Sequence, residues 1–356
     1  MSSEVEMLDF EAFKERYEKV PVEEYPNNVR EAVPEPVVSV HLLTYNHADY
    51  IREAIESVLM QEVDFPMEIV LGDDDSSDGT REICIEYAKQ HPDLIRLQLH
   101  HRENNIHLHG GPTHLFQYWY NTLSARGKYI AILSGDDYWT DPLKLQKQYD
   151  FLETKNGFVL SFHNAKVVSN EGKVVDESKT PDENKRYFSH EGVMKGPYLS
   201  ALSLFVLNIY KSVPEALIFC FNEDKVTISL AGQHGKGAYQ EEIEPAVYRM
   251  HDESIWSSNT SKHKFEAHSN TFKRLSIYYA KEDADVASYY GDRYISSKKG
   301  VYYASVREGV YRDSFRTWTY IVRYHAKRKN YRQAVSFGLN AFRFLLGDIR
   351  KRLLRS

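Results

Sequence analysis

The sequence is poor in cysteine, with only Cys84 and Cys220 among its 356 residues. These two are far apart and lack a metal-binding spacing, which excludes a disulfide framework and indicates a reducing compartment. No stretch approaches the roughly 20 consecutive apolar residues of a membrane span. The acidic start over residues 1–6 also lacks the basic-then-apolar plan of a signal peptide. We therefore expect a cytoplasmic protein, at the inner face of a membrane if it is attached to one.

Two phosphate-binding signatures are also missing. No Gly-x-Gly-x-x-Gly follows the first predicted strand and no Gly-Lys-Ser/Thr loop occurs, which argues against dinucleotide binding and P-loop chemistry. The net charge of -6 at pH 7 excludes a generally basic nucleic-acid binder. No nucleic-acid partner is therefore expected.

What the chain does contain is a regular alternation of strand and helix patterns. Apolar segments rich in β-branched residues predict strands over 37–44, 68–71, 95–99 and 129–134, with helical patterns between them. Units of this kind indicate βαβ crossovers and an α/β fold with a mostly parallel sheet flanked by helices. We predict this domain over residues 36–260. In the preceding arm, residues 1–35, a short charged helix is predicted over about residues 9–19. Prolines at positions 21, 26, 34 and 36 argue against regular structure after it, and residues 261–356 read as a helical region.

Paired aspartates follow two of the predicted strands. Asp73 and Asp74 come after the second, and Asp136 and Asp137 come after the fourth. Because the carboxyl ends of parallel strands meet at one edge of a sheet, both pairs are expected to face one crevice. Closely spaced carboxylates also suit a divalent cation that carries a phosphorylated substrate. For the second pair taken alone, an aspartate that caps the next helix is the structural alternative.

Three segments, over residues 38–46, 73–80 and 135–139, resemble the successive signatures of family 2 glycosyltransferases, which have the GT-A fold. The resemblance extends over about residues 36–260, with the segments in the expected order. The stretch 135–148 resembles a bacterial subgroup that is associated with surface polysaccharide synthesis.

This resemblance implies a nucleotide-diphospho-sugar donor, Mg²⁺ or Mn²⁺, and an inverting transfer to a hydroxyl of a glycan or lipid-linked acceptor. The residues that match donor-binding positions of the family are Thr44, Tyr45, Asn46, Asp73, Asp74, Ser134, Asp137 and Arg249. Among them, Asp74 matches the aspartate that commonly hydrogen-bonds the base. Asp136 matches the last member of the metal-binding Asp-x-Asp motif. Ser134 stands where the first acidic residue of that motif is usual, so one charge is missing there.

The reaction also needs a base for the acceptor hydroxyl and a cation for the departing diphosphate. Glu223 and Asp224 resemble the family's acidic pair, so Asp224 is the predicted base and Glu223 the second candidate. An acidic pair that only caps the following helix is the structural alternative.

Residues 248–251 and 254–256 look like the family's closing segment over the donor phosphates. Arg249 and His251 would then neutralise phosphate charge, and His251 is also a predicted metal ligand. A purely structural histidine is the alternative for His251.

Two other functions stay open at this point. A nucleotidyltransferase would share the sheet and the carboxylates, but it should carry a Gly-rich, basic loop after the first strand, where residues 44–47 offer none. A catalytically silent sugar-nucleotide binding module would fit the serine at position 134.

The C-terminal tail is basic, with Arg343, Arg350, Lys351, Arg352 and Arg355 against Asp348. One hypothesis is peripheral contact with an anionic membrane through an apolar face made of Phe342, Phe344, Leu345 and Leu346. The alternative is a solvated helix that packs on its own domain.

Overall fold

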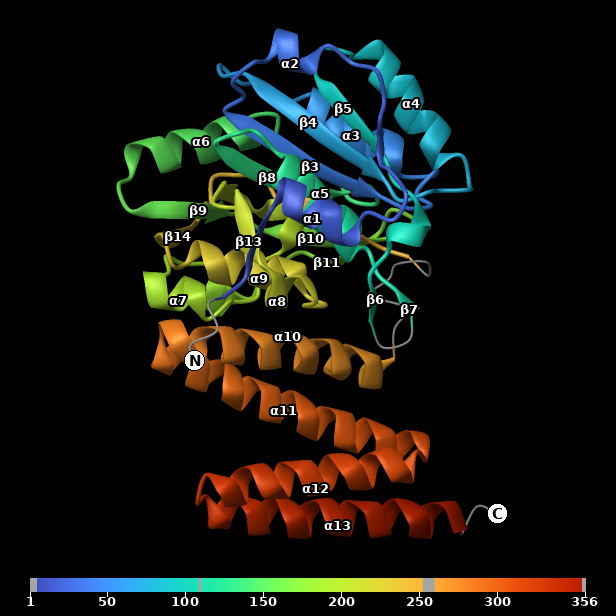
Figure 1. Ribbon diagram of the computed structural model, residues 1–356, viewed down its shortest axis with the longest axis vertical. Helices are drawn as coiled ribbons and strands as arrows, with labels where there is room; N and C mark the ends of the chain where they lie inside the picture. Colours follow the sequence, from blue (N-terminus) through green and yellow to red (C-terminus); the bar gives the residue numbers. More distant parts are fainter. Residues whose placement is uncertain (1–4, 109–110, 252–259, 354–356) are drawn as a thin grey trace. The chain divides into compact units, whose positions relative to one another are not determined.

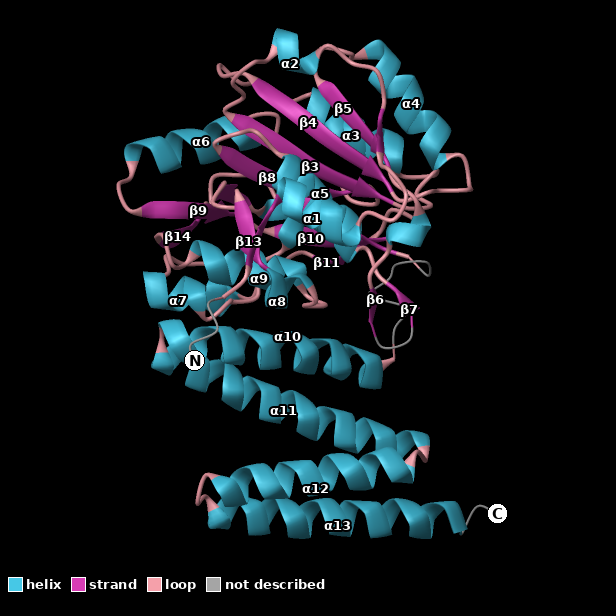
Figure 2. Ribbon diagram, viewed as in Figure 1, coloured by secondary structure: helices cyan, strands magenta, loops and turns pink. Residues whose placement is uncertain are grey.

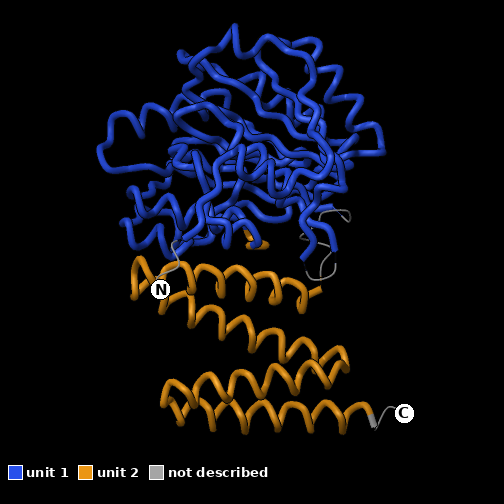
Figure 3. The backbone as a smooth tube through the Cα atoms, in the orientation of Figure 1, with its two compact units in different colours: residues 1–219, 223–251 blue, residues 220–222, 252–356 orange. Residues whose placement is uncertain are grey.

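The computed structural model describes residues 5–108, 111–251 and 260–353 (Figure 1). The chain divides into two compact units, residues 1–219 with 223–251 and residues 220–222 with 252–356 (Figure 3). The domain boundaries predicted from the sequence, after residues 35 and 260, stay a prediction.

A large sheet organises the first unit. In chain order its strands are β2 (Glu23–Glu24), β3 (Val38–Thr44), β4 (Met67–Asp73), β5 (Ile95–Leu99), β8 (Tyr129–Ser134), β9 (Phe158–Phe162), β12 (Phe205–Leu207) and β14 (Lys236–Tyr239). In space the order is β14-β9-β12-β8-β3-β4-β5-β2. Figure 2 shows the central neighbours β8, β3, β4 and β5. The neighbours β8, β3, β4 and β5 are parallel to one another, whereas β12 and β2 run antiparallel to the strands beside them. The predicted α/β fold with a mostly parallel sheet is confirmed.

The helices of this unit cover the sheet with their apolar residues. They are α1 (Phe10–Tyr17), α2 (Val29–Ala32), α3 (Ile51–Leu59), α4 (Thr80–Gln90), α5 (Leu115–Ser124), α6 (Lys144–Thr154), α7 (His190–Met194), α8 (Glu215–Ile218) and α9 (Glu223–Ala231). In α3, for example, Ile51, Ala54, Ile55 and Val58 share one face and are fully buried. The strands β3 and β4 are themselves buried almost throughout, as expected for a sheet covered on both faces.

Shorter strands complete the first unit. They are β1 (Met7–Asp9), β6 (His107–Leu108), β7 (Gly111–Pro112), β10 (Ala165–Ser169), β11 (Val174–Asp176), β13 (Ser212–Pro214) and β15 (Ala246–Met250). Strand β10 lies between β11 and β15 in a separate sheet. A bridge between Tyr138 and Val247 connects β15 to the segment that follows β8. Residues near position 249 are therefore held close to the predicted carboxylates at positions 136 and 137.

The N-terminal arm is more regular than predicted. Strand β1 pairs with β13, and β2 pairs with β5 at the edge of the main sheet. The short helix predicted over about residues 9–19 is present as α1, which spans Phe10–Tyr17. The expectation that the following prolines prevent regular structure was wrong, because Pro21, Pro26 and Pro34 fall between the short elements and not inside them.

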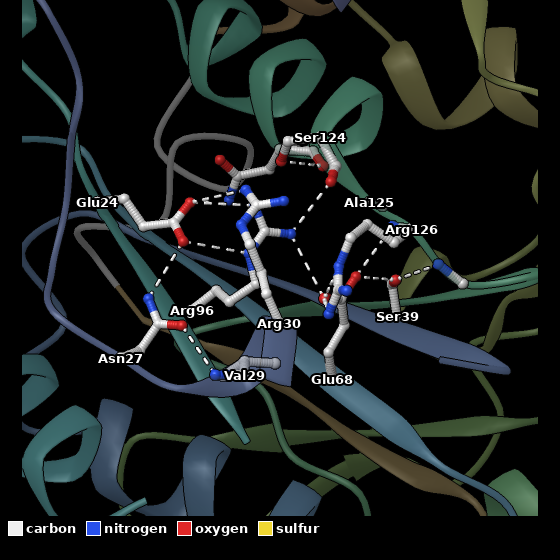
Figure 4. Close-up of polar contacts among 12 residues, drawn as sticks. Glu24, Asn27, Val29, Arg30, Ser39, Glu68, Arg96, Ser124, Ala125 and Arg126 are labelled. Carbon is white, nitrogen blue, oxygen red and sulfur yellow. Dashed lines mark hydrogen bonds and ion pairs between the residues drawn. The ribbon is translucent and has the colours of Figure 1, made fainter. Parts of the chain in front are cut away.

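A buried ionic network holds the amino ends of the parallel strands (Figure 4). Glu68, the second residue of β4, accepts hydrogen bonds from Ser39 of β3 at 2.7 Å and from the backbone N–H of Arg126 at 2.9 Å. Its other oxygen lies 2.7 Å from Arg126 Nη2 and 3.4 Å from Arg96 Nη1 of β5. Glu24 of β2 pairs with Arg96 at 3.1 Å. This network fixes the strand register at the edge opposite to the predicted site.

We expect Glu68→Gln to lower the free energy of unfolding by about 3 kcal/mol, because it leaves buried arginines without their counter-charge. Thermal or urea unfolding measures the change. Glu86→Gln is the matched control, since Glu86 pairs with Arg52 at 2.7 Å on the exposed surface and should change stability little. Equal effects of the two substitutions would contradict the importance of the buried network.

The second unit is helical, as predicted. Its helices are α10 (Ser261–Glu282), α11 (Ala284–Glu308), α12 (Tyr311–Lys327) and α13 (Tyr331–Leu353). Asp283 begins α11 by accepting the backbone N–H of Val286 at 2.9 Å, and Gly309 ends it with a φ of +80°. Among the described residues, no helix combines the length and apolar character that crossing a bilayer requires.

Candidate active site

Three parallel strands end level at one edge of the main sheet. Thr44, the last residue of β3, pairs with Asp73, the last residue of β4, and Leu43 pairs with Ser134, the last residue of β8. The turn after β8 lies tightly against β3, since a Cβ at Gly135 would be 2.6 Å from the Thr44 hydroxyl oxygen. Glycine is therefore required there, and the level ends bring Thr44, Asp73 and Ser134 together.

Asp136 is a buried carboxylate with two histidines beside it. Its Oδ2 lies 3.1 Å from His251 Nε2 and 3.9 Å from His47 Nε2. Burial opposes ionisation of Asp136, but the hydrogen bond with His251 and the charge of His47 outweigh it and lower its pKa to about 2. Its Oδ1 is buried and has no hydrogen-bond partner among the described residues. Asp136 therefore keeps a negative charge and one oxygen available to a ligand.

Asp137 and Arg249 connect this turn to strand β15. The carboxylate of Asp137 accepts the backbone N–H of Arg249 at 3.0 Å. Burial, together with the charge of Asp136, raises the pKa of Asp137 well above its usual value. The guanidinium of Arg249 donates to the Asp136 carbonyl oxygen at 3.1 Å, pairs with Glu53 and lies 4.6 Å from the ring centre of Tyr138. Asp137 thus positions the chain that carries Arg249.

The two carboxylates after β4 have different surroundings. Asp73 is fully buried and its Oδ2 lies 2.5 Å from Arg81 Nε of α4. Asp74 accepts hydrogen bonds from Arg102 at 3.1 Å and Asn105 at 2.9 Å. Burial raises the pKa of Asp74 to about 6 despite these donors. The Oδ1 atom of each carboxylate has no hydrogen-bond partner within the described part of the chain.

The residues after Thr44 shape the loop between the strands. Asn46 has a left-handed backbone with a φ of 52°, its N–H donates to Ser76 Oγ, and its amide oxygen accepts the Ser77 N–H at 3.0 Å. The ring of Tyr45 lies 4.1 Å from the guanidinium of Arg102. Asn46 therefore braces the loop after β4, while Tyr45 lies beside a cation that also holds Asp74.

The predicted acidic pair begins helix α9. Glu223 lies 2.9 Å from His114 Nε2, and Asp224 accepts the backbone N–H of Lys225 at 2.7 Å. Burial and the neighbouring charge of Glu223 raise the pKa of Asp224. Although burial disfavours the charged imidazole, Glu223 and Asp74 outweigh it and raise the pKa of His114. The charges of Asp74 and Asp224 also raise the pKa of His114, so His114 lies within electrostatic range of both the strand edge and the start of α9.

Several site residues were missed by the sequence analysis. They are His47, Arg81, Arg102, Asn105 and His114. The concentration of polar residues between positions 100 and 114, where the chain links β5 to α5, was the available signal for the last three. The predicted contribution of residues 254–256 lies outside the described residues, although His251 and Arg249 lie within them.

Sequence comparison finds a family that matches part of the chain. Residues 39–200 match the family description "Glycosyl transferase family 2". An uncharacterized protein of Mycobacterium tuberculosis is 32% identical over 231 residues, which cover 64% of this chain and 63% of the relative. The chain thus matches just under two thirds of the length of this curated relative. TuaG of Bacillus subtilis, a glycosyltransferase assigned to teichuronic acid biosynthesis, is 28% identical over 171 residues, covering 48% of this chain and 62% of TuaG.

Structure comparison identifies the fold. The crystal structure of residues 1–349 of S. aureus TarS, in complex with UDP-GlcNAc, is similar with a TM-score of 0.61 and 16% identity. The similarity covers 88% of this chain and 91% of the TarS chain. Residues 39–200 are thus similar to glycosyl transferase family 2, and the mostly parallel sheet has the GT-A fold.

Proposed function

We propose that this protein is an inverting, metal-assisted glycosyltransferase that moves a sugar from a nucleotide-diphospho-sugar to an acceptor hydroxyl. The observation that carries the proposal is the ionised, buried Asp136 with an unshared oxygen, in a family 2 domain and beside His251 and Arg249. The name of TuaG supports a role in bacterial surface polysaccharide synthesis, with a glycan or lipid-linked acceptor.

Asp74 is the proposed base-binding residue. Arg102 and Asn105 fix one of its oxygens, which leaves the buried Oδ1 to accept an N–H of the donor's base. With a pKa of about 6 it is ionised at neutral pH, which strengthens such a bond. Thr44 and Tyr45 lie at the end of the paired strand, where the nucleotide would extend, and Asn46 and Asp73 hold the surrounding loop in place.

Asp136 and His251 fit a divalent cation. A carboxylate oxygen and an imidazole nitrogen 3.1 Å apart are suitable ligand types for Mn²⁺, and Mg²⁺ is commonly bound by one or two carboxylates together with substrate phosphates. Within the described ranges no three His, Cys, Asp or Glu side chains form a metal cage, so the donor's phosphates and water would supply the other ligands. The cation, when bound, would draw negative charge from the leaving diphosphate. The hydroxyl of Ser134 supports the Asp136 carboxylate, where the family more often has a second acid.

Arg249 is the proposed protein cation for the diphosphate. Its guanidinium is held beside Asp136 by the backbone contact to Asp137 and by the ring of Tyr138. In this structure it pairs with Glu53, whose side chain is 53% exposed. A diphosphate carries more charge than one carboxylate, so it would replace Glu53 as the partner of Arg249.

Asp224 is the proposed base for the acceptor hydroxyl. His114 engages Glu223, which leaves Asp224 as the carboxylate that can accept the proton, and its raised pKa makes it a stronger base than an ordinary aspartate. A cytoplasmic location is proposed with this function, and the two buried cysteines, which form no disulfide, support it.

A second candidate function is a sugar-nucleotide binding module without catalysis. It is favoured by Ser134, which stands where the metal-binding motif usually has an acidic residue. A thermal-shift screen of nucleotide sugars, with and without Mn²⁺, tests binding, because a ligand of the folded state raises the melting temperature. We expect at least one donor to raise it by several degrees, and to do so more with Mn²⁺ than without.

Release of free sugar or transfer to an added glycan then separates an enzyme from a binding module. If a nucleotide sugar binds but its sugar is neither released nor transferred, the protein is a binding module and not an enzyme. A screen in which no nucleotide sugar binds would contradict both.

A further inference from the structure

Helix α13 presents a second apolar face to solvent. Tyr331, Val335, Leu339, Phe342 and Leu346 follow one another at helical spacing and are 62%, 60%, 54%, 53% and 50% exposed. The opposite face is packed, with Ala334, Phe337 and Ala341 buried inside the second unit. The predicted single face was therefore wrong, because Phe342 and Leu346 are exposed whereas Phe344 and Leu345 are half-buried.

Helix α12 extends this exposed face. Phe315 is 62% exposed, and its ring stacks on that of Trp318 with 5.5 Å between the centres. The indole of Trp318 donates to the Gly338 carbonyl oxygen of α13 at 3.3 Å, and Val322 approaches the same glycine. Because Gly338 lies one turn from Val335 and Phe342, the apolar residues of the two helices adjoin. Figures 1 and 2 show α12 and α13 side by side.

Basic residues border the apolar residues on both helices. On α13, Arg332 and Arg343 each follow directly after a residue of the apolar row, and Arg350 lies two turns beyond Arg343, so the three form a parallel row about 100° around the helix. On α12 the corresponding residues are Arg312, Arg316, Arg323 and Lys327. All seven are exposed, and no ion pair joins any of them to another described residue.

The segment that forms α12 and α13 is positively charged, whereas the chain as a whole is negatively charged. Residues 311–356 contain twelve Lys and Arg against two Asp, whereas the whole chain has a net charge of -6. An apolar strip with Trp, Phe and Leu between arginine rows is complementary to the surface of a bilayer that contains anionic lipid headgroups. A second copy of the chain fits less well, since a symmetric pairing of this face would bring like-charged rows together.

We propose that the α12–α13 hairpin is a peripheral membrane anchor that lies in the interface of an anionic bilayer. The apolar strip would enter the headgroup–acyl boundary while the flanking arginines bind lipid phosphates. The anchor does not depend on the chemistry of the sheet, so either proposal can fail without the other.

Co-sedimentation of the full chain with phosphatidylcholine vesicles, with and without phosphatidylglycerol, tests the anchor. We expect binding only when phosphatidylglycerol is present, and weaker binding at high salt. The double variant Leu339→Asp with Phe342→Asp should reduce binding by at least about tenfold, because it removes the inserted surface. Its control is Ile277→Asp, an equally exposed apolar residue on α10 that should bind as the wild type does.

The triple variant Arg332→Gln, Arg343→Gln and Arg350→Gln should also lose at least about tenfold and become less sensitive to salt. The control changes Lys89, Lys155 and Lys173 to Gln, which removes the same charge from exposed positions of the first unit. Circular dichroism and the melting temperature verify the fold of each variant.

Three outcomes would overturn the anchor. They are no binding by the wild type, binding that depends on the arginines but not on Leu339 and Phe342, and self-association that the double aspartate variant abolishes in the absence of vesicle binding. The last would identify a second copy as the occupant.

Discussion

Asp136→Asn is expected to reduce sugar transfer by roughly a thousandfold or more, with the fold intact. Asn keeps the shape and can still hydrogen-bond His251, but it removes the negative charge that a pKa of about 2 secures in the native protein. A site that holds a divalent cation depends on that charge, so the response of the melting temperature to Mn²⁺ in the presence of donor should be lost as well.

Asp64→Asn is the matched control for this experiment, because it makes the same chemical change at an exposed carboxylate outside the site. It should leave transfer and the Mn²⁺ response unchanged. Wild-type-like turnover by Asp136→Asn would refute the role of Asp136, whereas loss of activity with a lowered melting temperature and no donor binding would indicate a structural role instead.

The meeting of the two predicted carboxylate pairs at one edge of the sheet was predictable because it depends on strand order and direction. Alternating strands and helices require parallel neighbours, and parallel neighbours place Asp73 and Asp136 at the same edge. The structure adds a cause for the level ends, since Glu68, Ser39, Arg96 and Arg126 lock the register at the other edge. The sequence alone does not reveal this network, because its members come from four separate segments.

The side-chain partners inside the site could not be predicted, since they depend on contacts between distant residues. His114 reaches Glu223 across more than a hundred positions, and Glu53 pairs with Arg249 across a still longer separation. Asn46 was predicted to contact the nucleotide, and in the structure its backbone N–H donates to Ser76 while its amide oxygen accepts the Ser77 N–H. Local pattern indicates which residues reach the edge, but only packing decides which of them remain available to a ligand.

Asp224→Asn is expected to lower the turnover number by roughly a hundredfold to ten-thousandfold, the range that loss of a positioned base usually costs. Donor binding should be unaffected, because the proposed contacts to the base and the diphosphate come from Asp74, Asp136 and Arg249. Steady-state kinetics and the donor-induced thermal shift measure the two effects separately. A variant that loses donor binding in parallel with turnover would argue against the assignment of Asp224 as the base.

The pH profile gives a sharper test of the same residue. A base must be deprotonated, so the wild-type rate should fall as the pH drops through the raised pKa of Asp224. Glu223→Gln removes the neighbouring charge that helps to raise that pKa, and it can keep a hydrogen bond to His114. The acid limb should therefore move to lower pH in Glu223→Gln, while the same substitution at the exposed Glu86 leaves it in place. If the limb does not move, the group that titrates in the rate is not Asp224, and the base must be sought elsewhere at this edge of the sheet.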